Sequence, residues 1–262
     1  MMKTSLVITT YNNPDALHLV LLSLQRQTLL PAEVVVADDG STDETRQLLQ
    51  QWRSLLPCPI VHVWQEDRGY RRSRILNKAF AKATGDYLIN IDGDIIMEKH
   101  FIADHVRYAR KGYFGCGGRV RLGPTVTKQI YVARDYRLHF FTSDLTDRFN
   151  LLRMPLLTPL FFNRQHLRGC NIAFWRDDLI AVNGYDEQFE GWGLEDYDIA
   201  NRLKLIGRRI RHIKFSAIEY HLYHPERSND GQSNARNEAA LRQNMQEQRH
   251  RAKEGMDKYL NV

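Results

Sequence analysis

The sequence has 262 residues, of which 43% are hydrophobic and 26% are charged. A chain of this length and composition can bury a full core, which excludes a disordered tail and predicts one large globular domain or two fused lobes. The net charge of +6 would suit nucleic acid, an anionic membrane face or a phosphorylated substrate, and by itself it favours none of them.

The compartment is predicted from apolar runs and cysteines. No stretch approaches the roughly 20 apolar residues that span a bilayer, and the apolar run near the N-terminus is shorter than that of a secretory signal. The three cysteines, Cys58, Cys116 and Cys170, fit free thiols in a reducing compartment. We therefore expect a cytoplasmic protein. Membrane contact, if any, should be peripheral at the inner face, through basic surface and residues 151–162.

The N-terminal part of the chain alternates short apolar runs with amphipathic stretches. Strands are predicted at 6–8, 34–37, 60–64 and 87–91, and helices at 16–27, from a capping box at 41–44 to about 56, and at 71–83. Strands that alternate with helices indicate an α/β fold with a doubly wound, mostly parallel sheet. Such a sheet binds its ligand at the carboxyl ends of the strands.

After Gly118 the alternation is lost, and residues 119–165 have no clear period. Within them, LLRMPLLTPLFF at 151–162 is too short and too interrupted by proline to cross a membrane. A packed loop is the default interpretation, with an acceptor-site wall or a shallow membrane contact as alternatives. A second organised region runs from 169 to about 227, and residues 233–259 are predicted to form a polar helical tail.

Acidic residues follow two of the predicted strands. Asp92-Gly93-Asp94 comes directly after the strand at 87–91, where two carboxylates suit a hard divalent cation that bridges phosphate oxygens. Asp39 ends the second strand, where a carboxylate can accept hydrogen bonds from a base or ribose. Both segments would equally make ordinary turns. Arg71 and Arg72 could bind a diphosphate, or could form an exposed basic helix face.

Aromatic, acidic and imidazole side chains mark the second region. In GWGLED at 191–196, Trp192 offers a flat face to a sugar ring, and the acids offer a base and hydrogen-bond acceptors. The alternative is an acidic helix N-terminus with the indole in the core. His221 and His224 lie three residues apart, and with Asp94 they could form a mixed oxygen and nitrogen site for manganese or magnesium.

Together these motifs resemble the family 2 glycosyltransferases of the GT-A fold, with a C-terminal half similar to β-1,4-galactosyltransferases and chondroitin polymerase. The resemblance covers roughly 4–118 and 167–228. It rests on five motifs in family order: Thr9-Thr10-Tyr11-Asn12, Asp38-Asp39-Gly40-Ser41, Asp92-Gly93-Asp94, Arg168-Gly169-Cys170-Asn171 and Gly191–Asp198. It implies a single GT-A domain over 1–262, with a nucleotide-sugar-binding lobe at 1–118, an acceptor-binding lobe at 119–232 and a helical tail at 233–262.

The resemblance also implies roles for individual residues. Donor binding is expected of Thr9, Thr10, Tyr11, Asp39, Arg71, Arg72 and Asp92. Acceptor binding is expected of Trp192, Gly193, Glu195 and Asn171, and metal binding of Asp94, His224 and His221. Asp196 matches the catalytic base, with Glu195 as its acidic neighbour. Leu194 and Tyr197 depart from the Gly and Asp of galactosyltransferases, which leaves the donor sugar open.

The predicted activity is inverting, metal-dependent transfer of a hexose or N-acetylhexosamine from a UDP-sugar to a hydroxyl of a glycan. The resemblance favours a sugar of the galactose or N-acetylgalactosamine type, Mn²⁺ or Mg²⁺ as cofactor, and a role in surface polysaccharide or glycolipid synthesis. The glycan could be free or lipid-linked, and no nucleic-acid partner is expected. The alternatives are a metal-dependent nucleotidyltransferase, which would not need the motif at 192–196, and a non-catalytic glycan-binding module.

Overall fold

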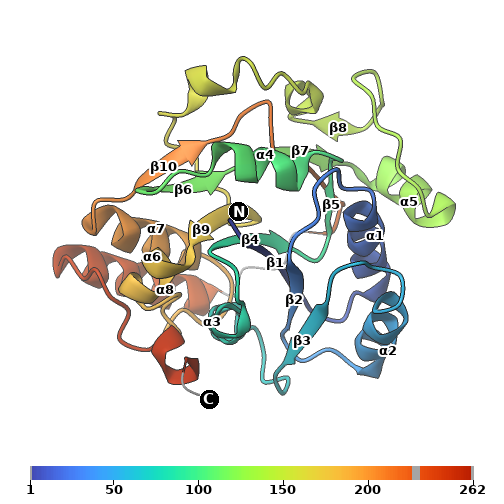
Figure 1. Cartoon of the computed structure of the whole chain (residues 1–262). Helices are drawn as coiled ribbons and strands as arrows, with labels where there is room; N and C mark the ends of the chain where they lie inside the picture. Colours follow the sequence, from blue (N-terminus) through green and yellow to red (C-terminus); the bar gives the residue numbers. More distant parts are fainter. Residues whose placement is uncertain (1, 226–230, 261–262) are drawn as a thin grey trace.

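The computed structural model describes residues 2–225 and 231–260 and contains a large and a small β-sheet (Figure 1). The large sheet has seven strands in the order β10 (Arg209–His212), β6 (Tyr113–Cys116), β9 (Asn171–Trp175), β4 (Tyr87–Asp92), β1 (Thr4–Thr10), β2 (Glu33–Asp38) and β3 (Ile60–Trp64). Neighbours in this sheet are parallel, except that β9 is antiparallel to both β4 and β6. The predicted doubly wound, mostly parallel sheet is confirmed.

The small sheet has four strands in the order β5 (Ile95–Met97), β11 (Ile218–His221), β7 (Gly118–Leu122) and β8 (Leu145–Thr146). The segment 119–165, which the sequence left unassigned, supplies most of β7, all of β8, helix α5 (Pro124–Ala133) and two short 3-10 helices, η1 (Arg148–Leu151) and η2 (Thr158–Phe161). These elements are too short, and buried and exposed positions alternate too irregularly within them, to give a periodic sequence pattern. Strands β9 and β10 belong to the predicted acceptor-binding lobe, yet they are part of the large sheet. The two lobes therefore do not correspond to the two sheets, and the division into donor-binding and acceptor-binding lobes stays a prediction.

Helices cover both faces of the large sheet. Besides α5, they are α1 (Pro14–Gln25), α2 (Asp43–Trp52), α3 (Arg72–Lys82), α4 (Phe101–Tyr108), α6 (Arg176–Val182), α7 (Glu195–Leu205) and α8 (Gly231–Gln246), with a last 3-10 helix η3 (Met256–Tyr259). Leu6 and Ile8 of β1 pack with α1, α2 and α4, whereas Val7 packs on the opposite face with α3, α6 and α7. Burial on both faces explains why the central strands are continuous apolar runs.

One predicted local feature, the capping box at 41–44, is wrong. Helix α2 begins at Asp43, and its N-cap residue Thr42 makes no side-chain cap hydrogen bond. The Ser41 hydroxyl instead accepts from the Asn12 backbone N–H at 2.9 Å, and the Asn12 side chain accepts from the Thr42 N–H at 2.9 Å. The loop after β1 therefore supplies the partners that the capping box would have supplied.

Residues 151–162 pack along one side only. The Thr158 hydroxyl is 2.8 Å from the Lys214 carbonyl oxygen and 2.9 Å from the Ser216 hydroxyl, so this segment is fastened to the loop before β11. Leu156 and Leu160, in contrast, are 86% and 77% exposed. The packed loop expected from the sequence therefore leaves two leucines in contact with solvent.

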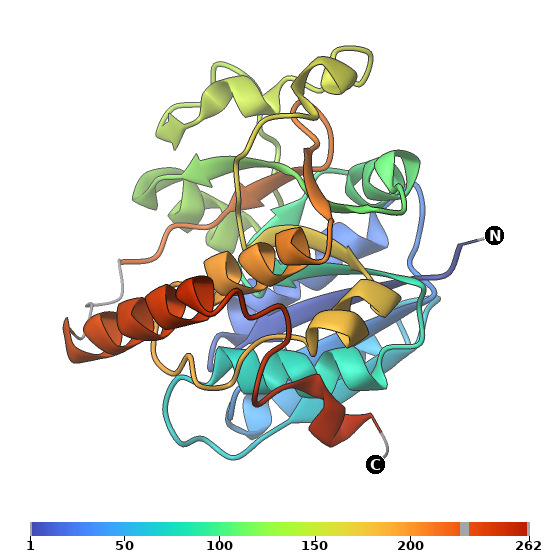
Figure 2. The same cartoon turned by 90° about the vertical axis from the view of Figure 1, so that its left-hand side faces the viewer.

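The tail is helical over only part of its predicted length, because α8 ends at Gln246. Figure 2 shows α8, in red, running alongside α7, and the two helices are in contact. All three cysteines are free thiols, as predicted. Within the described ranges, no helix combines the length and the apolar character needed to cross a bilayer.

Candidate active site

A cavity of about 980 Å³ opens at the carboxyl ends of β1, β2 and β4 and extends to the small sheet. This is the edge at which a doubly wound sheet binds its ligand. Most of the predicted site residues line it: Thr9, Thr10, Tyr11, Asp39, Arg72, Asp92, Asp94, Trp192, Asp196, His221 and His224. The predicted residues outside this lining are Arg71, Asn171, Gly193 and Glu195.

Asp39 lies at one end of the cavity and is held by two hydrogen bonds. Its Oδ1 accepts from the Gln65 side chain at 2.6 Å, and its Oδ2 accepts from the Arg71 backbone N–H at 2.9 Å. The Arg71 guanidinium itself donates to the Glu66 carbonyl. Arg71 thus orients Asp39 through its backbone, while its guanidinium binds a backbone carbonyl and the residue is not part of the cavity lining.

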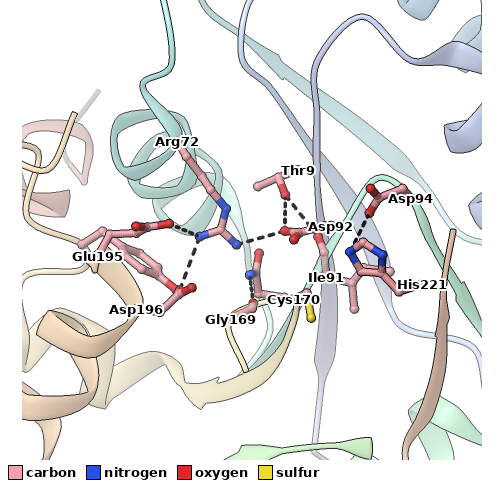
Figure 3. A network of polar contacts seen from close by, with 12 residues as sticks. Thr9, Arg72, Ile91, Asp92, Asp94, Gly169, Cys170, Glu195, Asp196 and His221 are labelled. Carbon is pink, nitrogen blue, oxygen red and sulfur yellow. Dashed lines mark hydrogen bonds and ion pairs between the residues drawn. The ribbon is translucent and has the colours of Figure 1, made fainter. Parts of the chain in front are cut away.

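Arg72 is the centre of an ion-pair network that was not visible in the sequence (Figure 3). Its guanidinium lies 3.0 Å from Asp92, 3.5 Å from Glu195 and 3.4 Å from Asp196. Burial alone would lower the pKa of Arg72, but the charges of Asp92 and Asp196 raise it well above its ordinary value. The alternative interpretation, an exposed basic helix face, is therefore excluded for Arg72, which is a buried cation that links α3, β4 and α7.

Asp196 has one oxygen held and one oxygen available. Its Oδ1 accepts from the Tyr185 hydroxyl at 2.8 Å and from Arg72 at 3.4 Å. Its Oδ2 makes no hydrogen bond among the described residues and lies against Gly169, where a Cβ atom would come within 1.6 Å of it. Any side chain at position 169 would therefore displace the Asp196 carboxylate. Tyr185 was missed in the sequence because it lies in a buried loop and shows its role only through this contact.

Glu195 lies beside Asp196 but faces the interior. Its side chain is 8% exposed, and its Oε2 has no hydrogen-bond partner among the described residues. Burial first, and then the charge of Asp196, raise its pKa to about 7. In this arrangement Glu195 contacts Arg72, so the structure gives it a supporting position instead of the predicted contact with the acceptor.

The raised pKa of Glu195 predicts a pH dependence of stability. The folded protein keeps the Glu195 proton more tightly than the unfolded chain, so this contribution is present in full below pH about 4.5 and is lost as pH rises to about 7. When pH rises from 5 to 8, the free energy of unfolding should therefore fall less in Glu195→Gln than in wild type, by on the order of 2–3 kcal/mol. Urea unfolding at both pH values measures this, with exposed Glu44→Gln as control. Parallel losses in all three proteins would contradict it.

Asp94, His221 and His224 come together from two elements. One ligand atom from each lies within 4.8 Å of the other two, with Asp94 3.9 Å from the His221 Nε2 and 3.4 Å from the His224 Nε2. The Leu222 N–H donates to the Asp94 carbonyl oxygen at 3.0 Å, which ties the end of β11 to the segment after β4. The predicted metal ligands therefore converge, although His221 and Asp94 are far apart in the sequence.

The donor chemistry of this triad fits a divalent cation. The Oδ1 of Asp94 is buried and has no hydrogen-bond partner among the described residues. Each histidine directs its Nδ1 at a carbonyl oxygen, His221 at Leu222 (2.9 Å) and His224 at Pro225 (3.0 Å). Because a carbonyl can only accept, both Nδ1 atoms carry the proton, which leaves both Nε2 lone pairs for a metal. The Leu222 and Pro225 carbonyls thus favour the tautomer that ligation requires.

Two other predicted residues, Asn171 and Gly193, hold backbone segments in place. Asn171 is fully buried, and its side chain binds His105 and the carbonyls of Gly118 and Ala217. It braces strand ends, and the predicted acceptor contact is not formed because its amide faces the interior. Gly193 has a φ of +107°, which favours glycine, and its carbonyl accepts from Asn237 of α8 at 3.0 Å. Asn237 had no signal in the sequence and fixes the loop that carries Trp192.

Comparison with protein-family models assigns most of the chain to one family. Residues 5–179 match the model of the family described as glycosyl transferase family 2. The chain belongs to glycosyl transferase family 2. Residues 161–225 also match the model described as the N-terminal domain of galactosyltransferase, so this family 2 chain has the galactosyltransferase-like region expected from its C-terminal motifs. Family membership classes it with transferases, as expected.

Relatives of this family 2 chain are longer than it is. Validoxylamine A glucosyltransferase of Streptomyces hygroscopicus subsp. limoneus is 29% identical over 231 residues, covering 78% of this chain and 48% of the relative. Chondroitin synthase of Escherichia coli is 27% identical over 256 residues, covering 86% of this chain and 35% of the relative. The chain thus spans about half, or less, of the length of these curated relatives.

Solved structures support the fold of this family 2 chain. S. aureus TarS 1-349 in complex with UDP-GlcNAc superposes with a TM-score of 0.61 and 21% identity, covering 86% of this chain and 60% of that one. The mannosyltransferase PcManGT from Pyrobaculum calidifontis, in complex with GDP-Man and Mn²⁺, has a TM-score of 0.61 and 20% identity, covering 92% and 64%. At these identities the likeness establishes the GT-A fold alone.

Proposed function

We propose that this chain is an inverting, metal-dependent glycosyltransferase that moves a hexose or N-acetylhexosamine from a UDP-sugar to a hydroxyl of a glycan. The observation that carries the proposal is the pairing of a metal-type triad, Asp94 with His221 and His224, and an available carboxylate oxygen on Asp196 in one cavity. A nucleotide-sugar donor is the ligand class found in the TarS and PcManGT complexes.

Donor binding is assigned to the end of the cavity at β1 and β2. Asp39 can accept from a uracil N–H with the lone pairs that Gln65 and Arg71 leave unused, and Tyr11 and Thr10 line the same end. Asp92 is oriented by Thr9 at 3.0 Å and by Arg72 at 3.0 Å, which suits it to accept from a ribose or sugar hydroxyl. A pyrimidine diphosphate fits this short acidic end.

The metal assignment follows from the ligand set. Two imidazoles with one carboxylate are unusual for Mg²⁺, which prefers oxygen ligands, and they suit Mn²⁺ better. When bound, the cation supplies charge neutralisation to the departing diphosphate. The chain's own part is to hold the ligands ready, through the carbonyls of Leu222 and Pro225 that fix both histidine tautomers.

The acceptor is assigned to the side of the cavity that Trp192 and Asp196 line. Trp192 is 53% exposed and offers its ring face to a sugar, while Gly169 leaves room for Asp196 to reach the acceptor hydroxyl. Asp196 Oδ2 takes the hydroxyl proton as the acceptor oxygen bonds to the anomeric carbon and the bond from that carbon to the diphosphate oxygen breaks. One displacement inverts the configuration, and no covalent enzyme intermediate forms.

A donor screen tests the proposal. With Mn²⁺ present, we expect UDP release from UDP-galactose or UDP-N-acetylgalactosamine, slow without acceptor and abolished by a chelator. UDP-glucose, UDP-N-acetylglucosamine and GDP-mannose should react more slowly, and nucleoside triphosphates should release no pyrophosphate. Turnover of GDP-mannose alone would contradict the UDP assignment. Pyrophosphate release from a triphosphate would instead favour a nucleotidyltransferase.

A further inference from the structure

Basic side chains gather beside the cavity, which one of them, Arg119, lines. The basic cluster is defined here as Arg119, Arg164, Arg168 and Lys214, with His166 and His212 among them. Arg164 and Lys214 lie over the same ring, that of Phe161, at 4.8 Å and 5.2 Å from its centre. The His166 and His212 rings are 5.6 Å apart. The cluster therefore brings together strand β7, the segment before β9 and the end of β10.

The cluster has few opposing charges. Across the described ranges, none of Arg119, Arg164, Arg168 and Lys214 has a carboxylate within 4.0 Å, whereas Arg72, Arg202 and Arg208 are each paired with at least one. Asp147 is near Arg119, Lys214 and His166, but its ion pair is with Arg121, at 3.9 Å. Glu219 lies near Arg119 and is buried. The local field is therefore positive.

The side chains of the cluster respond to one another's charge. Burial, followed by Arg168 and His166, lowers the pKa of His212 to about 4. Burial, followed by Arg164 and Arg168, also lowers the pKa of Lys214. Like charges held this close destabilise the folded protein unless an anion offsets them. Such an arrangement is typical of a binding surface for anions.

The arginines of the cluster also keep most of their donors unused. Arg168 donates through Nη1 to the Gly117 carbonyl at 3.5 Å, and Arg119 through Nη1 to the Cys170 sulfur at 3.5 Å. The Nε atoms of both are buried and have no partner among the described residues. A guanidinium carries five N–H donors in a fork that matches carboxylate and phosphate oxygens. Each of these two side chains is anchored through Nη1, and its Nη2, which makes no hydrogen bond among the described residues, can bind an anion.

We propose that the basic cluster binds an anionic group, a carboxylate or a phosphate, of the acceptor glycan; this inference rests on the proposed function. The cluster is continuous with the catalytic side of the cavity, because Arg119 lines it and Arg168 precedes Gly169, which lies against Asp196. A glycan whose terminal hydroxyl reaches Asp196 therefore extends its preceding units toward the cluster. The acceptor is an acidic polymer, and the cluster selects it over neutral glycans.

Calorimetric titration tests this with three probes in the presence of UDP and Mn²⁺: an unsulfated chondroitin hexasaccharide, its carboxyl-reduced neutral form, and a ribitol-phosphate hexamer. We expect wild type to bind one anionic probe at least about 10-fold more tightly than the neutral one, with an affinity that falls as salt increases. Preference for the hexasaccharide identifies a carboxylate as the anion, and preference for the hexamer identifies a phosphate.

A charge-matched pair of variants locates the effect. The Arg164→Gln, Lys214→Gln double variant should lose about 10-fold in affinity for the preferred anionic probe and little for the neutral one. Arg53→Gln with Lys111→Gln removes the same charge from exposed positions elsewhere and should bind like wild type. Equal binding of anionic and neutral probes by wild type, no binding of either anionic probe, or equal losses in both double variants would overturn the inference.

Two measurements distinguish failure of this inference from failure of the proposed function, and glycan binding from membrane binding. If wild type does not bind UDP with Mn²⁺, the proposed function fails; if it binds UDP but shows no anion preference, only the inference fails. Sedimentation with vesicles containing phosphatidylglycerol covers the other source of phosphate. Loss of vesicle binding in the Arg164→Gln, Lys214→Gln variant, with glycan binding unchanged, would assign the cluster to a membrane surface and overturn the inference.

Discussion

Replacing Asp94 with asparagine should weaken Mn²⁺-dependent UDP binding by at least about 100-fold. Asparagine keeps the shape of the side chain but removes the only charge in the triad that can neutralise a cation. Loss of a partner that merely orients a ligand costs roughly 10–100-fold in metal affinity or activity, so loss of a direct ligand should reach the upper end of that range or exceed it. Calorimetry with UDP, with and without a chelator, measures the effect.

The histidines provide an internal check on this prediction. His224→Ala should weaken UDP binding in Mn²⁺ in the same direction, because its Nε2 lies 3.4 Å from Asp94. Asp15→Asn and His139→Ala change the same residue types at exposed positions away from the cavity and should bind like wild type. Equal UDP affinity in wild type and Asp94→Asn, or affinity unaffected by the chelator, would remove the metal assignment.

The fold of the first half could be predicted because its signals are local. Strands β1, β2 and β4 are runs of mainly apolar residues buried on both faces, and amphipathic helices follow β1, β2 and β3. The small sheet gave no such signal. Strands such as β5 and β11 have three and four residues, and they pair across more than 120 positions of the chain, as Ile95 does with His221. Their pairing depends on tertiary contacts that no sequence window contains.

The candidate site likewise has residues that could be predicted from the sequence and contacts that could not. Carboxylates at the ends of β2 and β4 could be predicted to face a ligand, since the position follows from the strand itself. Their partners could not be predicted: Arg72 meets Asp196 across 124 positions of the chain and is enclosed by three carboxylates. Asn171 illustrates the same limit, because a motif match specifies a residue type and leaves the direction of its side chain undetermined.

The two sheets are joined at the chemical centre. Asp94 follows the last β4 residue of the large sheet, and His221 ends β11 of the small one, linked by the backbone hydrogen bond from Leu222 to Asp94. Asp196 lies in the first turn of α7, and α8 braces this region through Asn237, which binds the Gly193 carbonyl, and Asn244, which binds Asp198. The metal ligands and the base thus come from separate segments of the chain, which allows their roles to be separated by mutation.

Asp196→Asn should reduce sugar transfer by about 10²–10⁴-fold while UDP and Mn²⁺ affinities stay nearly unchanged. Asparagine can still accept the hydrogen bond from Tyr185 and can occupy the space beside Gly169, but it cannot take a proton at neutral pH. Loss of a general base has this magnitude, and an effect confined to the turnover rate identifies an interaction made in the transition state.

Three comparison variants make this result specific to proton transfer. Tyr185→Phe removes the donor to Asp196 Oδ1 but keeps the ring that stacks on Phe80, so it should slow transfer much less than Asp196→Asn. Glu195→Gln should slow transfer less than Asp196→Asn, since Glu195 acts on Asp196 only through Arg72. Asp177→Asn, exposed on α6, should behave as wild type. Transfer kinetics and UDP titration on the same preparations distinguish these outcomes.

If Asp196→Asn transfers sugar at close to the wild-type rate, the proton leaves by another route and the assignment of the base is wrong, even though the fold and the metal triad would be unaffected.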